Sequence, residues 1–258
     1  MERDFMTRKK MIEFNGEELC AEIVIPEHGG VGRLVVLAHG GPGGVKEGPA
    51  DLYVDLADQL ASKGIASVRF DFLGAGESSG AYEEMTITRQ VDELGAVVEY
   101  VQSDLRPSSL GIVGESYGAT IAILGLSQAS YSALVLLWPA IWLLDNTFQS
   151  YVTPEKIEQA RRHGYIEEEG EKVGLAFLEQ LLEFDNVSSG LQGNPVPTLF
   201  VHGKADQEVP YQQSVQAAEL LSGPKRVILV PSGDHCLERP SEREIVYRET
   251  VDWLVNHL

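Results

Sequence analysis

The chain has 258 residues, of which 43% are hydrophobic, and its formal net charge is −19. This length permits one large domain or two small ones, and the apolar share supports a sizeable core. The negative charge argues against nucleic acid and against anionic membrane surfaces as binding partners.

The N-terminus and the cysteines indicate a cellular location. Residues 1–10 are rich in charge and no apolar segment follows them, so we expect no signal peptide. No apolar run is long enough for a membrane span. Cys20 and Cys236 are far apart in the sequence and form no C-x-x-C motif, which fits a reducing compartment. We therefore expect a cytoplasmic protein, either a monomer or a homodimer.

Hydrophobic periodicity predicts a chain in which strands alternate with helices. Short apolar runs predict strands at residues 11–14, 20–25, 33–38, 65–70, 110–114, 133–138, 196–201 and 226–230. Helical spacing predicts helices at residues 52–63, 86–104, 154–162, 175–184, 211–221 and 241–257. Such alternation is typical of a mainly parallel sheet that helices cover on both faces, which is an α/β fold.

Two local signals refine this prediction. Asn15-Gly16 lies between the first two apolar runs and predicts a hairpin, which would add an antiparallel edge to the sheet. Thr88 is a plausible N-cap for the helix predicted over 86–104.

The strand pattern stops between residues 140 and 194. This segment holds ten acidic and four basic residues and no strong strand. We interpret it as a lid inserted into a core domain that comprises residues 1–139 and 195–258. Residues 162–174 inside it could form a small hairpin with Glu169-Gly170 at the turn.

One stretch has the spacing of a nucleophile turn. Gly114 and Gly118 flank Ser116 in a G-x-S-x-G pattern, between a predicted buried strand and a helix. Such a turn strains the serine backbone and exposes its hydroxyl at a helix N-terminus. Glycine is needed at both positions because the strand and the helix nearly touch there. A purely structural turn would have the same pattern, so the site needs a base and an acid elsewhere.

Those groups follow other strands. Loops at the carboxyl ends of parallel strands form the sites of open α/β sheets. Ser116, Asp206 and His235 each come after a predicted strand, in that order along the chain. A serine hydroxyl needs a base, and histidine is the natural one near neutral pH. Asp206 would orient the imidazole, whereas Asp234 adjoins His235 and is predicted to be structural.

Other polar groups near strand ends have less defined roles. His39 and His202 each end a strand in a His-Gly pair, and we expect both to bond to the backbone. Glu115 adjoins the predicted nucleophile, where a supporting role and simple solvation are equally plausible. No cluster of histidine, cysteine and aspartate has metal-ligand spacing, and we expect no cofactor.

A tetrahedral intermediate would need two N–H donors. We predict the backbone of Tyr117, the residue after the nucleophile, as one donor. The loop after Ala38 should supply the other, with Gly41 the first choice and Gly40 the alternative.

These motifs together resemble the α/β-hydrolase superfamily over nearly the whole chain. The landmarks are His39-Gly40-Gly41-Pro42-Gly43, Asp71-Phe-Leu-Gly-Ala-Gly-Glu-Ser78, Gly114-x-Ser116-x-Gly118, His202-Gly-Lys-Ala-Asp206 and Gly233-Asp234-His235. The resemblance implies an α/β-hydrolase fold with a small lid, and a serine hydrolase of the Ser-His-Asp type.

Within the superfamily, the chain is most similar to bacterial feruloyl/cinnamoyl esterases and small carboxylesterases. That similarity implies a serine carboxylesterase acting on a small-molecule ester of feruloyl/cinnamoyl or short-chain acyl type. It also places an oxyanion N–H on Gly41, where those enzymes often have a bulky residue. Five aromatic residues of the lid are candidates for lining the substrate pocket, with Trp142 and Tyr165 the first choices: Trp142, Phe148, Tyr151, Tyr165 and Phe177.

Two alternatives remain open. His39-Gly-Gly-Pro-Gly43 also resembles proline iminopeptidases, which would make the protein an aminopeptidase or amidase. Their elbow sequence and larger cap differ from those found here. The second alternative is a non-catalytic binding protein of the hydrolase fold, which would hold a ligand under the lid.

Overall fold

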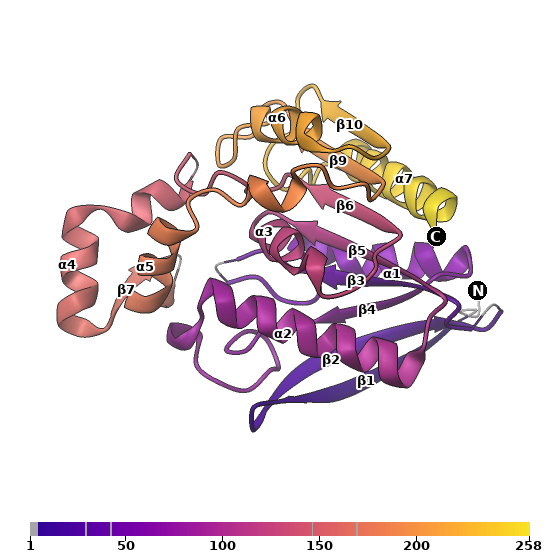
Figure 1. Cartoon of the computed structure of the whole chain (residues 1–258), viewed down its shortest axis with the longest axis horizontal. Coiled ribbons are helices and arrows are strands. Elements are labelled where there is room, and N and C mark those ends of the chain that lie inside the picture. Colours follow the sequence, from indigo (N-terminus) through magenta and orange to yellow (C-terminus); the bar gives the residue numbers. More distant parts are fainter. Residues whose placement is uncertain (1–4, 29, 42, 146, 169) are drawn as a thin grey trace.

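A central β-sheet organises the fold, and the helices pack around it (Figure 1). The computed structural model describes residues 5–28, 30–41, 43–145, 147–168 and 170–258. The strands of the sheet lie in the order β1-β2-β4-β3-β5-β6-β9-β10, and the pairs from β4 to β10 are parallel. The strands are β1 (Phe5–Phe14), β2 (Glu17–Pro26), β3 (Arg33–Ala38), β4 (Ala66–Phe70), β5 (Ser109–Glu115), β6 (Ala133–Leu137), β9 (Thr198–Gly203) and β10 (Lys225–Val230).

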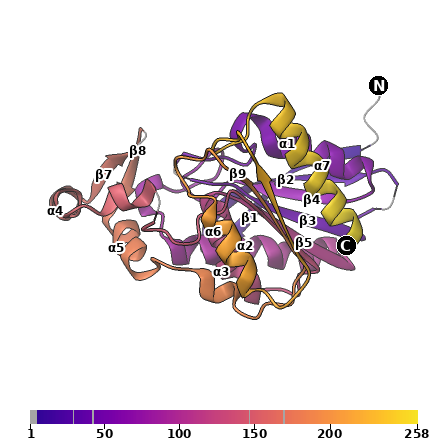
Figure 2. The ribbon, with the colours of Figure 1, turned by 90° about the horizontal axis from the view of Figure 1, so that it is seen from above.

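Helices cover both faces of this sheet. Figure 2 shows α1 and α7 on one face, and α2, α3 and α6 on the other. Their bounds are α1 (Leu52–Ser62), α2 (Ile87–Tyr100), α3 (Tyr117–Leu124), α6 (Gln212–Leu220) and α7 (Pro240–His257). This is the doubly covered, mainly parallel α/β architecture that the alternation of strands and helices predicts, so the predicted fold class is confirmed.

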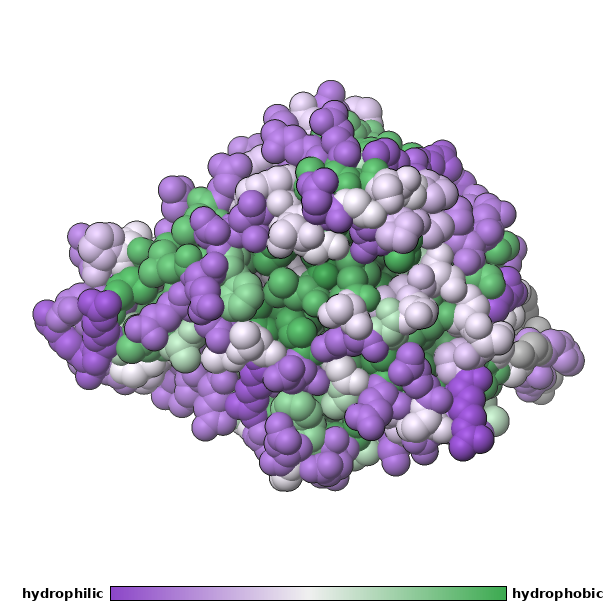
Figure 3. All heavy atoms as spheres, viewed as in Figure 1, coloured by the Kyte–Doolittle hydropathy of each residue, from purple (hydrophilic) through white to green (hydrophobic). Residues whose placement is uncertain are grey.

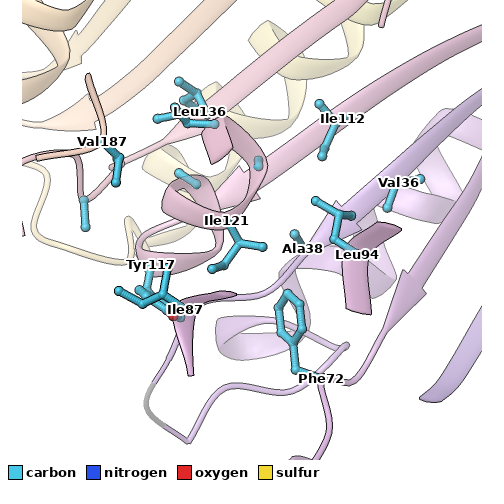
Figure 4. Packing of buried hydrophobic residues seen from close by; sticks show 14 of the residues in the cluster. Val36, Ala38, Phe72, Ile87, Leu94, Ile112, Tyr117, Ile121, Leu136 and Val187 are labelled. Carbon is cyan, nitrogen blue, oxygen red and sulfur yellow. The ribbon is translucent and has the colours of Figure 1, made fainter. Parts of the chain in front are cut away.

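The two core layers follow from the side-chain alternation of the strands. On β3, Val35 and Leu37 pack towards α1 and α7, whereas Leu34 and Val36 face the opposite core layer. Figure 4 shows the second layer, in which Val36, Ile112 and Leu136 from three neighbouring strands lie near Ile121 of α3. All of these side chains are buried, and each stabilises the fold by about 1.5–3 kcal/mol.

The N-terminal hairpin and the start of α2 allow two local sequence predictions to be compared with the structure. β1 and β2 pair antiparallel around Asn15-Gly16, and β2 joins the sheet antiparallel to β4, as the sequence predicts.

The predicted cap of α2 is wrong by two residues. Thr86 is the N-cap, and its Oγ1 accepts a hydrogen bond of 3.1 Å from the N–H of Arg89. Thr86 has the extended backbone that this position requires, whereas Thr88 lies inside the helix.

Residues 140–194, called the inserted segment below, connect β6 to β9 and project to one side of the sheet (Figure 1). The segment contains η5 (Thr147–Val152), α4 (Pro154–His163), β7 (Tyr165–Glu168), β8 (Glu171–Gly174), α5 (Leu175–Glu183) and η6 (Ser188–Leu191). β7 and β8 form the predicted antiparallel hairpin; Gly170 lies in its turn, and Glu169 is outside the described residues.

The inserted segment is packed against the core rather than free of it. A Cβ on Gly174 of β8 would lie 2.0 Å from the carbonyl oxygen of Glu83, which is part of η2 (Tyr82–Glu84). Phe148 and Phe177 of the segment pack edge-to-face on the ring of Tyr117, at centroid distances of 5.6 and 5.7 Å.

Leu182 on α5 is half-exposed, and Figure 3 shows apolar residues extending from this segment towards the middle of the same face. Within the described part of the chain, no helix is long and apolar enough to cross a bilayer.

A buried carboxylate on α2 makes stability depend on pH. Burial raises the pKa of Glu93 to about 8, although the N–H of Leu73, 3.0 Å away, and Arg89 both favour the charged form. Since the pKa of Glu93 is higher in the folded state than in the unfolded state, the stability that this side chain contributes is fully present below about pH 4.5 and is lost as the pH rises through 8. We therefore expect the free energy of unfolding to fall by about 2 kcal/mol between pH 5 and 7 because of Glu93.

Glu93→Gln tests this expectation because glutamine keeps the acceptor for Leu73 and cannot ionise. Urea unfolding of wild type and variant at pH 5, 6, 7 and 8 should show the variant gaining relative stability as the pH rises. Asp92→Asn, at an exposed neighbouring position, is the control and should follow the wild type. Parallel curves for wild type and Glu93→Gln would contradict the assignment.

Candidate active site

The turn between β5 and α3 holds Ser116 in a strained backbone conformation. Ser116 has φ 52° and ψ −121°, a region that costs a non-glycine residue on the order of 1–3 kcal/mol. A Cβ on Gly118 would lie 2.2 Å from the carbonyl oxygen of Ala38, and one on Gly114 would lie 2.6 Å from that of Gly118. The close approach of strand and helix therefore explains both glycines. It places the Ser116 hydroxyl at the carboxyl edge of the sheet.

Two further strand ends bring an imidazole and a carboxylate to this hydroxyl. Ser116 Oγ lies 3.0 Å from Nε2 of His235, and Nδ1 of His235 lies 2.8 Å from Oδ2 of Asp206. A carboxylate only accepts hydrogen bonds, so Nδ1 carries the proton and Nε2 is free to accept from the serine. The structure thus brings together the three residues that the sequence predicts, from the loops after β5, β9 and β10.

The surroundings of Asp206 keep it charged. Its Oδ1 accepts from the N–H groups of Glu208 (2.8 Å) and Val209 (2.9 Å). Burial alone would raise the pKa of Asp206, but hydrogen bonds from His202 and His235 hold it below its usual value. Burial opposes the charged form of His235, yet the hydrogen bond and the charge of Asp206 raise its pKa overall. The pair is therefore arranged to stabilise an imidazolium next to Ser116.

His202 bonds to the backbone, as predicted, and also to two side chains. Its Nε2 lies 3.1 Å from Oδ2 of Asp206 and 3.0 Å from the carbonyl oxygen of Val209, so this nitrogen carries the proton. Its Nδ1 accepts from Ser214 Oγ at 2.7 Å. The predicted bond to the backbone is therefore present, and His202 in addition ties the carboxylate of Asp206 to α6. His39 does bond to the backbone, through Gly40 and Phe72.

Glu115 is buried below the loop that follows β3. Its Oε1 accepts from the N–H of Gly40 and its Oε2 accepts from Nε1 of Trp138 at 3.2 Å. A Cβ on Gly40 would lie 2.8 Å from this carboxylate. Of the two roles left open for Glu115, simple solvation is therefore wrong. Gly40 uses its N–H on Glu115, so this group is not free to serve as an oxyanion donor.

Tyr117 and Gly41 are the remaining predicted donors. Tyr117 is the first residue of α3, where N–H groups have no partner within the helix. Gly41 is half-buried, and its Cβ position is 3.5 Å from the Tyr117 ring. The next residue of the motif, Pro42, is outside the described residues, and the N–H of Gly43 donates to the Tyr82 hydroxyl at 3.0 Å.

A cavity of about 290 Å³ opens beside Ser116 and His235. It is bordered by the loop from Gly40 to Pro49, and by Phe148 and Tyr151 of the inserted segment. Among the described residues, the predicted pocket residues Trp142 and Tyr165 do not line it. Trp142 forms a bridge to Asn186 at the base of the segment, and Tyr165 lies on β7 with Lys172 Nζ 4.6 Å from its ring centroid.

A buried ion pair holds the cavity wall. Lys46 is buried, and its Nζ lies 3.0 Å from Oδ2 of Asp71, 2.8 Å from Oε2 of Glu77 and 3.2 Å from Oε1 of Glu47. The N–H of Lys46 also donates to Oδ1 of Asp71 at 2.7 Å. Because Val45 and Gly48 line the cavity, this ion pair fastens the wall to the loop after β4.

The same carboxylates belong to a group of three potential metal ligands. Cys20, Asp71 and Glu77 form this group in the described part of the chain, with ligand atoms within 4.8 Å of one another. The Lys46 ammonium already forms ion pairs with both carboxylates at hydrogen-bonding distance. The group therefore serves as an ion-pair network, and we assign it no metal.

Fold and site together define the class of protein, an α/β hydrolase. The chain belongs to the prolyl oligopeptidase family, whose model matches residues 54–258. It is 26% identical over 225 residues to the uncharacterised protein YfhR of Escherichia coli K12, covering 87% of this chain and 70% of YfhR.

Solved structures from other organisms share this fold, and two of them illustrate the similarity. Est1E from Butyrivibrio proteoclasticus, with ferulic acid bound, superposes with a TM-score of 0.79 at 21% identity and covers 96% of this chain and 98% of its own. Mouse alpha/beta hydrolase domain-containing protein 10 superposes with a TM-score of 0.75 at 18% identity, with the same coverage of 96% and 98%.

Proposed function

We propose that the protein is a serine carboxylesterase in which Ser116, His235 and Asp206 form the catalytic triad. The observation that supports this most is the continuous hydrogen-bond chain from Ser116 Oγ to His235 (3.0 Å) and on to Asp206 (2.8 Å), beside an open cavity. The strained backbone of Ser116 is a second support, since strain of this kind gathers at functional sites.

The proposed reaction has two halves. Ser116 Oγ attacks the ester carbonyl carbon while its proton moves to Nε2 of His235. The tetrahedral oxyanion accepts hydrogen bonds from the N–H groups of Gly41 and Tyr117. It collapses when the bond from carbon to the alcohol oxygen breaks, and His235 gives its proton to the leaving oxygen. Water, deprotonated by His235, then attacks the acyl-enzyme; the bond from the acyl carbon to Ser116 Oγ breaks, His235 returns the proton to Oγ, and the acid is released.

We also propose that residues 140–194 form a lid subdomain over the core of residues 1–139 and 195–258. Phe148 and Tyr151 of this segment line the cavity, and its hairpin is packed against η2. With about 290 Å³, the cavity is at the small end of ligand sites, which favours short acyl groups or one aromatic ring.

A labelling and turnover experiment tests the proposal. The wild type should react covalently with a fluorophosphonate and hydrolyse p-nitrophenyl acetate. Ser116→Ala should lose the label and about 10⁴-fold or more of kcat. Methyl ferulate belongs in the panel because Est1E holds ferulic acid, and proline p-nitroanilide tests the peptidase chemistry of the family.

The possible outcomes separate the candidate functions. Turnover of the anilide without turnover of either ester would replace the esterase by an aminopeptidase with the same triad. Absence of both labelling and turnover in the folded wild type would favour a binding protein of the hydrolase fold.

A further inference from the structure

We propose that Glu208 selects esters whose alcohol part carries a positive charge, such as an alkylammonium group. This inference rests on the proposed esterase function and specifies its substrate class. It starts from the charges that border the cavity. The ionisable side chains among the described lining residues include Glu115, Glu208 and His235, and none of those described is a lysine or an arginine.

The two acidic residues differ in what a substrate can reach. Glu115 is buried and already accepts from Gly40 and Trp138. The side chain of Glu208 is 57% exposed while it lines the cavity. Glu208 is therefore the carboxylate that a substrate entering the cavity would meet.

The position of Glu208 points to the alcohol rather than the acyl group. Its Oε2 lies 3.7 Å from Nε2 of His235, the atom that gives a proton to the leaving alcohol in the proposed reaction. Its main-chain N–H is held by Oδ1 of Asp206 at 2.8 Å, so the backbone of residue 208 is fixed relative to the triad. A cation attached close to the alcohol oxygen would thus come near the carboxylate.

The aromatic residues that line the cavity would also favour an alkylammonium group. Phe148 and Tyr151 face the cavity with their rings edge-to-face at a centroid distance of 5.4 Å. Aromatic rings attract alkylammonium groups, and quaternary ammonium ligands are often held by aromatic side chains. The net charge of −19 adds a long-range attraction for cations.

A pair of isosteric esters tests the inference. Acetylcholine and 3,3-dimethylbutyl acetate have the same shape and differ in one positive charge. We expect the wild type to prefer acetylcholine in kcat/KM by about tenfold, as one carboxylate near a partly solvated cation can supply. Glu208→Gln should reduce this preference to within about twofold of unity. Salt should weaken the preference of the wild type, since Glu208 is solvent-accessible.

Glu238→Gln is the matched control, because Glu238 is an exposed acid three residues beyond His235 that does not line the cavity. It should retain the preference of the wild type. A role of Glu208 confined to the titration of His235 would change the pH profiles of both esters equally and leave their ratio intact. That result, or a wild type without preference, would overturn the inference.

The same assay separates this inference from the proposed function. Turnover of both esters at equal rates would leave the esterase standing and remove the role of Glu208. Failure to hydrolyse any ester or to take the fluorophosphonate label would instead remove the proposed function, and the inference with it.

Discussion

Replacing Asp206 by asparagine is expected to lower kcat on esters by about 10³- to 10⁴-fold. The carboxylate accepts four hydrogen bonds, from two backbone N–H groups at Oδ1 and from two histidines at Oδ2. An amide has one oxygen, which the two backbone N–H groups will hold, so its NH₂ group faces the histidines. His235 must then accept at Nδ1 and carry its proton on Nε2, where it cannot take one from Ser116.

Steady-state kinetics with p-nitrophenyl acetate checks this result, and Asp234→Asn supplies the control. Asp234 adjoins His235 but is exposed, so its variant should stay within about twofold of the wild type. Circular dichroism and urea unfolding should show that both variants fold. A folded Asp206→Asn enzyme with more than a tenth of the wild-type kcat would refute the role of Asp206 in orienting His235.

Replacing Lys46 by methionine is expected to lower the free energy of unfolding by about 3 kcal/mol. The ammonium is buried with Asp71, whose side chain is fully buried, and its removal leaves that carboxylate without its charge partner. The backbone N–H groups of Lys46 and Glu77 still donate to Asp71, which keeps the loss at the lower end of the range for buried pairs. The cavity wall from Val45 to Gly48 should loosen, so KM should rise as well.

Lys9→Met is the control for this experiment, because Lys9 also pairs with Glu77 but is half-exposed. Exposed ion pairs contribute little to stability, so this variant should be near wild type. Urea unfolding with an unchanged m value measures both effects. A loss below about 1 kcal/mol for Lys46→Met would show that the ion pair does not hold the wall.

The sequence was sufficient for features that depend on period and on strand order. Continuous apolar runs at 33–38 and 133–138 marked β3 and β6, because strands buried on both faces have no polar side. Ser116, Asp206 and His235 could be grouped in advance, since parallel strands end at one edge of a sheet and each residue follows such an end. The glycines around Ser116 were predictable from the spacing of the G-x-S-x-G motif, although a Cβ on Gly118 would meet Ala38 at the end of β3 rather than a segment adjacent in sequence.

Charged residues that become buried were harder to predict. Lys46 follows a glycine-rich loop, and its sequence context is that of an exposed residue. It is buried because the loop after β4 closes over it with Asp71 and Glu77. Glu115 is buried for a similar reason, as Gly40 and Trp138 arrive from other strand ends. In both cases the compensating hydrogen-bond partners, acceptors for Lys46 and donors for Glu115, come from distant segments, and no local pattern identifies them.

The choice of pocket residues was decided in the same way. Five aromatic residues of the inserted segment were candidates because of their residue type, with Trp142 and Tyr165 the first choices, but of these five Phe148 and Tyr151 are the ones that line the cavity. Which side chain of a helix or hairpin faces a site depends on how the whole element docks.

The sequence by itself thus determined the α/β architecture, the strained turn at Ser116 and the residues predicted to act with it. Hydrophobic period, glycine spacing and the common edge of parallel strands are sufficient for these features. Only the tertiary structure decided that Glu115 and Lys46 are buried, that His202 shares Asp206, and that Glu208 borders the cavity. These outcomes depend on side chains from separate segments meeting at one place, which the packing of the complete fold controls.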